Sequence, residues 1–403
     1  MSLEHKRPAG LVKRRLARAA AVSMTIAVAC SPLRPTLAES PSPVATTAAS
    51  PVSIAESPGA AASVAGTIVY ERTDHDGDPE KAYTIAPDGA SDPRVLLTAQ
   101  QFYCCPQFSP DGSRVAASTP GGQTLSAVTV NTDGTGYSVM PLPDKTIILA
   151  PGLWLDAKEV TFTGWDDSDP SRNGMYVGDP GQPATLRRVT SSPGLQDQVV
   201  AVSADGTRIA FVRAAAGAEL GPLFTVNADG TNVKQVSPAE ALVSPAGGWG
   251  GSSATWSPDG SKLTFAATVG GCACAVYVVD VDGGNPRKVF ASQGLIFGAH
   301  WSPDGRWIAF ESQPADSTWD QVMLIHPDGT GLKIITFGGQ EAGSWSPQWS
   351  PDGSKLVFQS GGRGGDYVDL WTSNADGSDP VQLTHDPGHY DTYSWGQWPP
   401  VGH

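Results

Sequence analysis

Two cysteine pairs are the residues whose chemistry is most constrained by their spacing. Cys104 and Cys105 are adjacent in YCCP, and Cys272 and Cys274 are separated by one residue in GCAC. Such thiols form disulfides in an oxidising compartment, whereas a four-thiolate zinc site needs a reducing one. We expect a structural disulfide role for all four cysteines. The three pairings stay open, although a bond between neighbours in the chain would be strained.

A group of histidines and aspartates stands near the end of the chain, namely His385, Asp386, His389 and Asp391. Imidazole and carboxylate groups bind transition metals and transfer protons. Two histidines in one loop are a weak signal, however, so we expect neither a metal site nor a catalytic site there.

The segment DHDGD, Asp74 to Asp78, carries carboxylates at alternate positions, as calcium-binding loops do. Its glycine stands fourth rather than sixth, and no bidentate Glu follows at the right distance. We expect a solvated hairpin loop and no cofactor, with calcium as the alternative. The segment GGSSA at 250–254 lacks the closing glycine of a nucleophile elbow, so no catalytic residue is predicted.

The N-terminus has the features of a secretory signal. A basic stretch precedes the apolar run Ala19 to Ala29, which is too short for a permanent membrane span. The following AVAC resembles a bacterial lipoprotein signal, although Ala27 stands where such signals usually carry Leu. We predict a signal peptide over residues 1–29 and lipidation of Cys30, with plain secretion or a retained anchor as alternatives. Lipidation would also leave an even set of four cysteines.

Residues 30–63 are rich in Ser, Pro, Ala and Thr and contain no aromatic side chain, so we expect a disordered tether. The formal net charge of the whole chain is -14, and removal of the basic signal segment makes it more negative. This charge argues against a nucleic acid or an anionic membrane surface as the main partner.

Residues 64–403 repeat one hairpin. Copies of Ser-Pro-Asp-Gly occur in FSPDGSRVAA, WSPDGSKLTF, WSPDGRWIAF and WSPDGSKLVF. Proline presets φ and glycine accepts positive φ, so this tetrapeptide forms a tight turn between two strands. A second turn of the same kind recurs every 45 to 53 residues, at Gly89, Gly134, Gly181, Gly230, Gly283, Gly329 and Gly377. That period is typical of a four-stranded propeller blade.

Seven second turns stand against only six first turns, which centre on Gly112, Trp154, Gly206, Gly260, Gly305 and Gly353. The segment GQWPPVG, Gly396 to Gly402, aligns with PQWSPDG and supplies the missing inner strand. We predict an all-β, seven-bladed propeller that the C-terminal strand closes, with six blades as the alternative. Trp256, Trp301, Trp349 and Trp398 recur at one point of the repeat and are expected to pack between blades.

The pattern WSPDGSKLTF followed by VYVVDVDGG resembles the WD-like propeller repeat of the TolB family, over roughly residues 64 to 403. The repeat is specific for the fold and weak for the function, because propeller halves of prolyl-oligopeptidase-type enzymes share it. The family has six blades and a separate N-terminal α/β domain, whereas this chain has seven units after a tether. The resemblance therefore implies a TolB-like envelope lipoprotein rather than TolB itself.

Loops between blades, which carry Cys104 and Cys105, and loops between the middle strands, which carry Cys272 and Cys274, are expected to emerge on the same face of the ring. The loops between blades also carry several aromatic side chains. Aromatic residues round the mouth of a closed ring suit recognition of an envelope protein, a peptide or a glycan. The candidate ligand-binding residues are Tyr103, Trp249, Phe297, Trp345, His389 and Tyr390.

We expect a non-enzymatic binding scaffold, and the alternative is a lyase or hydrolase that acts on an extracellular polymer. The protein is expected to be monomeric and extracytoplasmic, held at the membrane by its lipid alone. A secreted or soluble periplasmic protein is the alternative to that location.

Overall fold

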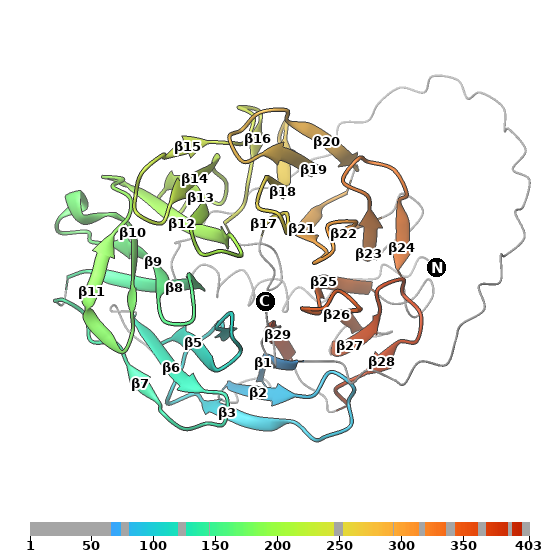
Figure 1. Cartoon of the computed structure of the whole chain (residues 1–403), viewed down its shortest axis with the longest axis horizontal. Helices are drawn as coiled ribbons and strands as arrows, with labels where there is room; N and C mark the ends of the chain where they lie inside the picture. The colour runs from blue at the N-terminus through green and yellow to red at the C-terminus, as the bar shows by residue number, and fades with distance from the viewer. Residues whose placement is uncertain are drawn as a thin grey trace, which may run out of the picture.

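Seven β-sheets stand round a common centre in the computed structural model (Figure 1). The structure describes residues 66–73, 80–119, 126–144, 146–245, 253–292, 294–313, 319–335, 343–361, 368–385 and 389–396. Each sheet is one blade, and within it neighbouring strands pair antiparallel. The prediction of a seven-bladed propeller is confirmed, and the six-bladed alternative is wrong.

Blade 1 consists of β29 (His389–Gly396), β1 (Thr67–Thr73), β2 (Lys81–Ile85) and β3 (Arg94–Thr98). Blade 2 consists of β4 (Gln107–Phe108), β5 (Arg114–Ser118), β6 (Ala127–Asn131) and β7 (Ser138–Val139). Blade 3 consists of β8 (Ile148–Trp154), β9 (Val160–Trp165), β10 (Gly174–Asp179) and β11 (Gln182–Arg188). The one helical element within the described residues is the short 3-10 helix η1 (Pro170–Arg172).

Blades 4 and 5 consist of β12 (Leu195–Val202), β13 (Arg208–Ala215), β14 (Leu223–Asn227) and β15 (Lys234–Gln235); and β17 (Ala254–Trp256), β18 (Lys262–Val269), β19 (Cys272–Asp280) and β20 (Arg287–Ala291). Blades 6 and 7 consist of β21 (Ile296–Trp301), β22 (Ile308–Ser312), β23 (Gln321–Ile325) and β24 (Lys333–Ile335); and β25 (Gly343–Trp349), β26 (Lys355–Gly361), β27 (Asp369–Asn374) and β28 (Val381–Gln382).

Two local features differ from the prediction. Blade 5 carries a fifth strand, β16 (Ala241–Leu242), which pairs with β18 because β18 is long enough to hold two partners along one edge. Cys272 and Cys274 were expected in a loop between the middle strands. They lie in β19 instead, because Gly270 and Gly271 adopt positive φ and turn the chain before them.

The Asp-Gly first turns of blades 2 and 4 to 7 are built from their own side chains. In blade 5, Gly260 takes a φ of 66° and its N–H donates to the Ser257 carbonyl at 2.8 Å. The Asp259 carboxylate accepts from the Ser257 hydroxyl at 2.6 Å and from the Ser261 N–H at 3.0 Å. These hydrogen bonds, above all the one from Ser257, lower the pKa of Asp259 to about 2. Equivalent carboxylates cap the turns at Asp111, Asp205, Asp304 and Asp352.

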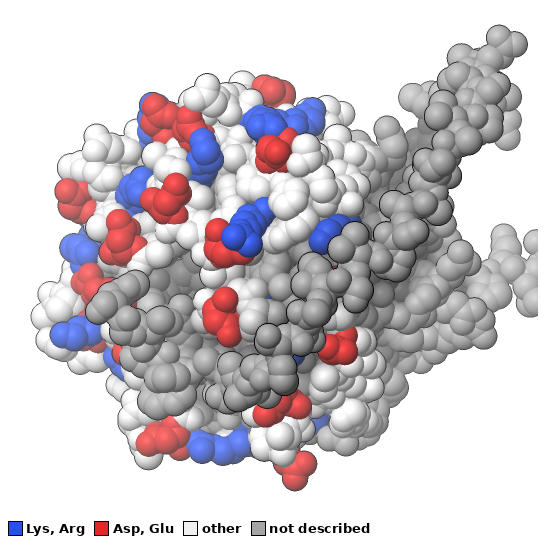
Figure 2. Space-filling model, turned by 45° about the vertical axis from the view of Figure 1, so that its right-hand side comes forward, with Lys and Arg blue, Asp and Glu red and all other residues white. Residues whose placement is uncertain are grey.

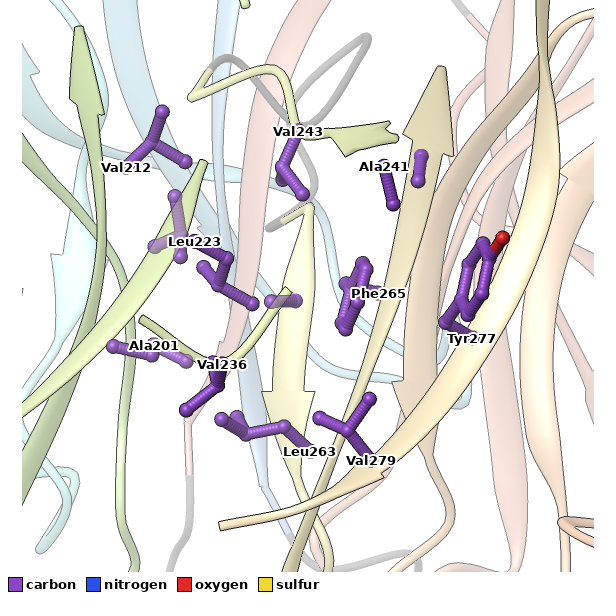
Figure 3. Packing of buried hydrophobic residues seen from close by; sticks show 14 of the residues in the cluster. Ala201, Val212, Leu223, Val236, Ala241, Val243, Leu263, Phe265, Tyr277 and Val279 are labelled. Atoms are coloured by element: carbon purple, nitrogen blue, oxygen red, sulfur yellow. The ribbon is translucent and has the colours of Figure 1, made fainter. Parts of the chain in front are cut away.

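Apolar side chains pack between the blades rather than within one common core. Between blades 4 and 5, Leu223 and Val236 of one sheet lie close to Leu263, Phe265 and Val279 of the next (Figure 3). All five are at most 2% exposed. Every blade thus buries both of its faces, which is why the strands read as nearly continuous apolar runs. Within the described residues, no helix is long and apolar enough to cross a bilayer.

The ring closes through β29, which pairs antiparallel with β1 (Figure 1). Closure by the C-terminal strand is therefore confirmed, but the predicted alignment is wrong by three residues. Trp395 lies opposite Ile68, as Trp349 lies opposite Leu356 and Trp301 opposite Ile308. The residue at the tryptophan position of blade 1 is Trp395, not Trp398. The register of a strand depends on the pairing of the whole strand, so the short GQW match could not predict it.

Side-chain hydrogen bonds connect neighbouring inner strands round the centre. The Trp349 indole donates to the His300 carbonyl of blade 6 at 3.0 Å, and the Trp154 indole donates to the Gln107 carbonyl of blade 2 at 2.9 Å. The Gln348 amide donates to the Tyr393 carbonyl at 2.8 Å, across the closing seam. The Tyr393 hydroxyl, fully buried, donates back to the Ser346 carbonyl. The closing strand is thus held by side chains as well as by its ladder.

Replacing Tyr393 with Phe should lower the free energy of unfolding by about 1–3 kcal/mol, because the buried Ser346 carbonyl loses its hydroxyl donor. Urea denaturation measures this loss. The matched control is Tyr137→Phe, since the Tyr137 hydroxyl donates to the Gln101 carbonyl from a residue that is 39% exposed. Equal losses in the two variants would show that Tyr393 does not pin the closing strand.

Candidate functional site

The two faces of the ring differ in their chain segments. The turn face carries the first and second Asp-Gly turns. The opposite loop face carries the segments that precede the inner strands, such as 99–106 and 189–194, and those between the middle strands, such as 166–173. In the view of Figure 2, acidic and basic side chains are interspersed over the surface shown, with no patch of a single sign.

Tyr103 and the adjacent cysteines lie on the loop face, before β4. Tyr103 and Cys104 are half-buried and Cys105 is exposed. The structure joins Cys104 to Cys105 in a disulfide, the pairing between neighbours that the sequence analysis regarded as strained. The Tyr103 N–H donates to the Ser118 carbonyl at 2.8 Å, and the Ser118 N–H donates to the Cys104 carbonyl at 3.1 Å. This segment is therefore tied to β5 by its backbone.

Two more candidate aromatic residues are described, and both are half-buried. Phe297 lies in β21 opposite Glu311 of β22. Trp345 lies in β25, packs against the cluster between blades 7 and 1, and donates from its indole to Asp320 Oδ2 at 3.3 Å. Each therefore packs on a blade and still offers some surface.

The remaining candidates lie partly or wholly outside the described residues. Trp249, Cys30 and the segment Asp74 to Asp78 lie outside the described residues. His389 and Tyr390 begin β29, but only their backbone is described. Cys272 and Cys274 are likewise described by their backbone alone.

Two buried glutamates occupy the same position in different blades. Glu311 follows Phe310 in β22, and Glu71 follows Tyr70 in β1; the two are 0% and 3% exposed. Glu311 Oε2 accepts from the Ser346 N–H of blade 7 at 3.0 Å, and Glu71 Oε2 accepts from the Cys105 N–H of blade 2 at 3.3 Å. Both donors are non-glycine residues with positive φ, at 53° and 67°. These carboxyls support the bulged inner strand of the next blade.

Burial raises the pKa of Glu311 well above its ordinary value, and the nearby Asp320 carboxylate adds to the rise. Within the described residues, Glu311 Oε1 has no hydrogen-bond partner. His300 of β21 is also enclosed, and burial lowers its pKa to about 4, so its imidazole is neutral at pH 7. Perturbed pKa values often mark catalytic groups, but neither side chain opens to solvent, and the Glu311 contacts explain its place structurally.

Blade 3 holds a fixed polar cluster on the loop face that the sequence analysis did not single out. Arg172 donates to Asp166 Oδ2 at 2.7 Å, to Asp144 Oδ2 at 2.8 Å and to the Thr146 hydroxyl at 2.9 Å. The Ser168 hydroxyl is the main cause that lowers the pKa of Asp166 to about 2. The acidic run DDSDPSR was the available signal. Its carboxylates are satisfied by this loop, which makes the cluster a brace between two loops.

Among the described residues, no three or more His, Cys, Asp or Glu side chains lie close enough together to hold a metal ion. His385 is exposed at the end of blade 7, and its expected neighbour Asp386 lies outside the described residues.

Replacing Glu311 with Gln should remove a pH-dependent loss of stability. A carboxyl whose pKa is raised by folding stabilises the protein below its ordinary pKa of 4.5, and that contribution disappears as the pH rises toward the folded value. The wild type should therefore lose stability relative to the variant as the pH rises above about 4.5, by at most about 1.4 kcal/mol per pH unit. Urea denaturation at several pH values measures the difference.

Glutamine keeps an acceptor for the Ser346 N–H, so the variant should fold. The exposed Glu240→Gln is the control and should follow the wild type at every pH. Parallel curves for the wild type and Glu311→Gln would contradict a carboxyl whose pKa is raised by burial at this position.

Comparison with known proteins gives one family match. Residues 239–395, which cover blades 5 to 7 and most of the closing strand, match the model described as TolB beta propeller domain. Among curated relatives, the protein Atu1656 of Agrobacterium fabrum is 34% identical over 26% of this chain and 34% of its own length. The Tol-Pal system protein TolB of Anaeromyxobacter dehalogenans is 29% identical over 27% of this chain and 23% of its own length. The matched part thus spans about a third or less of these relatives.

Solved structures agree on the fold. TolB from Acinetobacter baumannii superimposes with a TM-score of 0.52 at 18% identity, over 83% of this chain and 67% of that one. Oligogalacturonate lyase from Vibrio parahaemolyticus superimposes with a TM-score of 0.51 at 13% identity, over 79% of this chain and 86% of that one. At such identities the likeness concerns the propeller alone.

Proposed function

Because the chain is a TolB-like β-propeller, we propose that it is a non-enzymatic scaffold that binds a protein or other ligand outside the cytoplasm. The observation that carries the proposal is the match of residues 239–395 to the TolB propeller, together with a relative named for the Tol-Pal system. The predicted signal segment over residues 1–29 supports the location.

The loop face is the proposed binding surface. Its segments differ from blade to blade, whereas the turn face repeats one Asp-Gly motif that offers a ligand little to distinguish. Tyr103, Phe297 and Trp345 are half-buried, so each combines a fixed backbone with exposed aromatic surface. Aromatic anchors that are held in place lose little entropy on binding and bury large areas. An envelope protein, a peptide or a glycan would suit such a surface.

An enzyme is the second candidate, because an oligogalacturonate lyase has the same architecture. A lyase or hydrolase would require a cluster of acidic, basic or metal-binding groups open to the loop face. Incubation of the purified protein with acidic polysaccharides and peptide substrates distinguishes the two candidates, since a scaffold leaves the polymers intact.

We propose membrane attachment through lipid on Cys30, because AVAC resembles a lipoprotein signal and a tether follows it. Cys30→Ala should move the protein from the membrane fraction to the soluble fraction, because one thiol carries the whole anchor. Fractionation and mass spectrometry of the N-terminal peptide measure this change. Cys105→Ser is the control and should stay with the membranes; a Cys30→Ala protein that also stays there contradicts lipid anchoring.

Tyr103→Ala and Phe297→Ala should each weaken binding of a partner captured from an envelope extract by about tenfold or more, because each removes aromatic contact area. Titration of the purified partner measures the dissociation constant, and thermal melting follows stability. Val139→Ala is the control, since Val139 is 47% exposed on the outer strand β7. Lower melting temperatures with unchanged affinity would show that the two aromatic residues belong to the blade core and not to the binding surface.

A further inference from the structure

The disulfide between Cys104 and Cys105 lies on the loop face with one half open to solvent, since Cys105 is exposed and Cys104 is half-buried. We propose that this pair is a thiol–disulfide exchange site, which a dithiol partner reduces while the propeller stays folded. The proposal goes beyond the binding function and does not depend on it. It gives these cysteines a chemical role instead of a structural one.

The repeat shows that the local backbone does not need the disulfide. Cys105-Pro106-Gln107-Phe108 of blade 2 corresponds to Ser346-Pro347-Gln348-Trp349 of blade 7 in sequence and in register. Ser346 has a φ of 53°, close to the 67° of Cys105, although its neighbour Trp345 offers no sulfur to bond with. The same bulge therefore forms in blade 7 without a cross-link.

The contacts that hold the bulge are also repeated. Glu71 accepts from the Cys105 N–H, as Glu311 accepts from the Ser346 N–H. Tyr103 and Cys104 are tied to Ser118 of β5 by two backbone hydrogen bonds. None of these bonds uses a cysteine sulfur atom. Opening the disulfide should leave the segment in place.

The two sulfur atoms differ in a way that sets the direction of attack. Cys105 is the exposed half and therefore the one an incoming thiolate reaches. Cys104 Sγ lies 3.8 Å from the Ser118 hydroxyl, which is itself 7% exposed. A hydroxyl at this place can donate to the thiolate that leaves, and a stabilised leaving thiolate speeds exchange. Ser118 is thus a positioning residue for Cys104.

The exchange balances in two steps. A thiolate of the dithiol attacks Cys105 Sγ, so that a mixed disulfide forms, the bond to Cys104 breaks, and the Cys104 thiolate takes a proton. The second thiolate of the partner then attacks the partner's first sulfur, which is bonded to Cys105 in the mixed disulfide. Cys105 leaves as a thiolate, which is protonated in turn. The protein gains two electrons and two protons, and the partner becomes a disulfide. An oxidised dithiol partner reverses the sequence.

The test treats the folded full-length protein with dithiothreitol, alkylates free thiols and locates the label by peptide mapping, which separates this pair from Cys272 and Cys274. We expect Cys104 and Cys105 to be blocked before treatment and labelled after it. The melting temperature should stay within about 3 °C of its oxidised value. Labelling that requires denaturant, free thiols before treatment, or unfolding on reduction would each overturn the proposal.

Variants that each lack one cysteine of the pair test the direction of attack. Cys104→Ser leaves Cys105, which should react rapidly with an aromatic disulfide reagent to form a mixed disulfide. Cys105→Ser leaves Cys104, which should react several-fold more slowly with the same reagent. Ser118→Ala in the otherwise unchanged protein should slow reduction by dithiothreitol several-fold, whereas Ser138→Ala on β7 of the same blade should not. Equal rates within both pairs of variants would overturn the assignment of Cys105 as the attacked sulfur.

Discussion

The pairing of β29 with β1 is the constraint on which the other blades depend. It joins Gly396 to Thr67, near the two ends of the described chain, so it forms only when every intervening blade has turned by the right amount. Closing such a long loop costs conformational entropy, but this cost grows only with the logarithm of the loop length. The gain is the removal of two open sheet edges, which would otherwise pair with other chains. Tyr393 and Gln348 add side-chain hydrogen bonds to the same seam.

One position of the repeat buries polar groups where neighbouring blades meet. The residue that directly follows the aromatic residue of the second strand, such as Tyr70 or Phe310, meets the inner strand of the next blade. Glu71 and Glu311 accept backbone N–H groups there, and Thr163 donates to the Asp197 carbonyl at 3.0 Å. Blades 4 and 5 place Val212 and Ala266 at this point, among apolar neighbours. The chemistry at the position thus follows from what the neighbouring inner strand leaves unsatisfied.

The loop face can vary because the turns and the inter-blade packing carry the fold. Blade 2 replaces the Trp345-Ser346 pair of blade 7 with two cysteines and keeps the bulge, since the supporting bonds come from the backbone and from a glutamate of the preceding blade. Blade 3 builds a brace from Arg172 and two carboxylates in the same region. A fold of this kind accommodates different side chains on one face without losing its ring.

The sequence by itself determined the number of blades, because seven second turns recur at a nearly regular interval and an Asp-Gly turn is local: its hydrogen bonds form within a few residues. Asp259 and Gly260 need no distant partner to form their turn. Only the tertiary structure decided the register of the closing strand, where Trp395 rather than Trp398 meets Ile68, because that register depends on packing against blades 7 and 1 together. The same holds for Glu71 and Glu311. Their partners come from other strands or adjacent blades, and no spacing along one chain records which blade will cover a side chain.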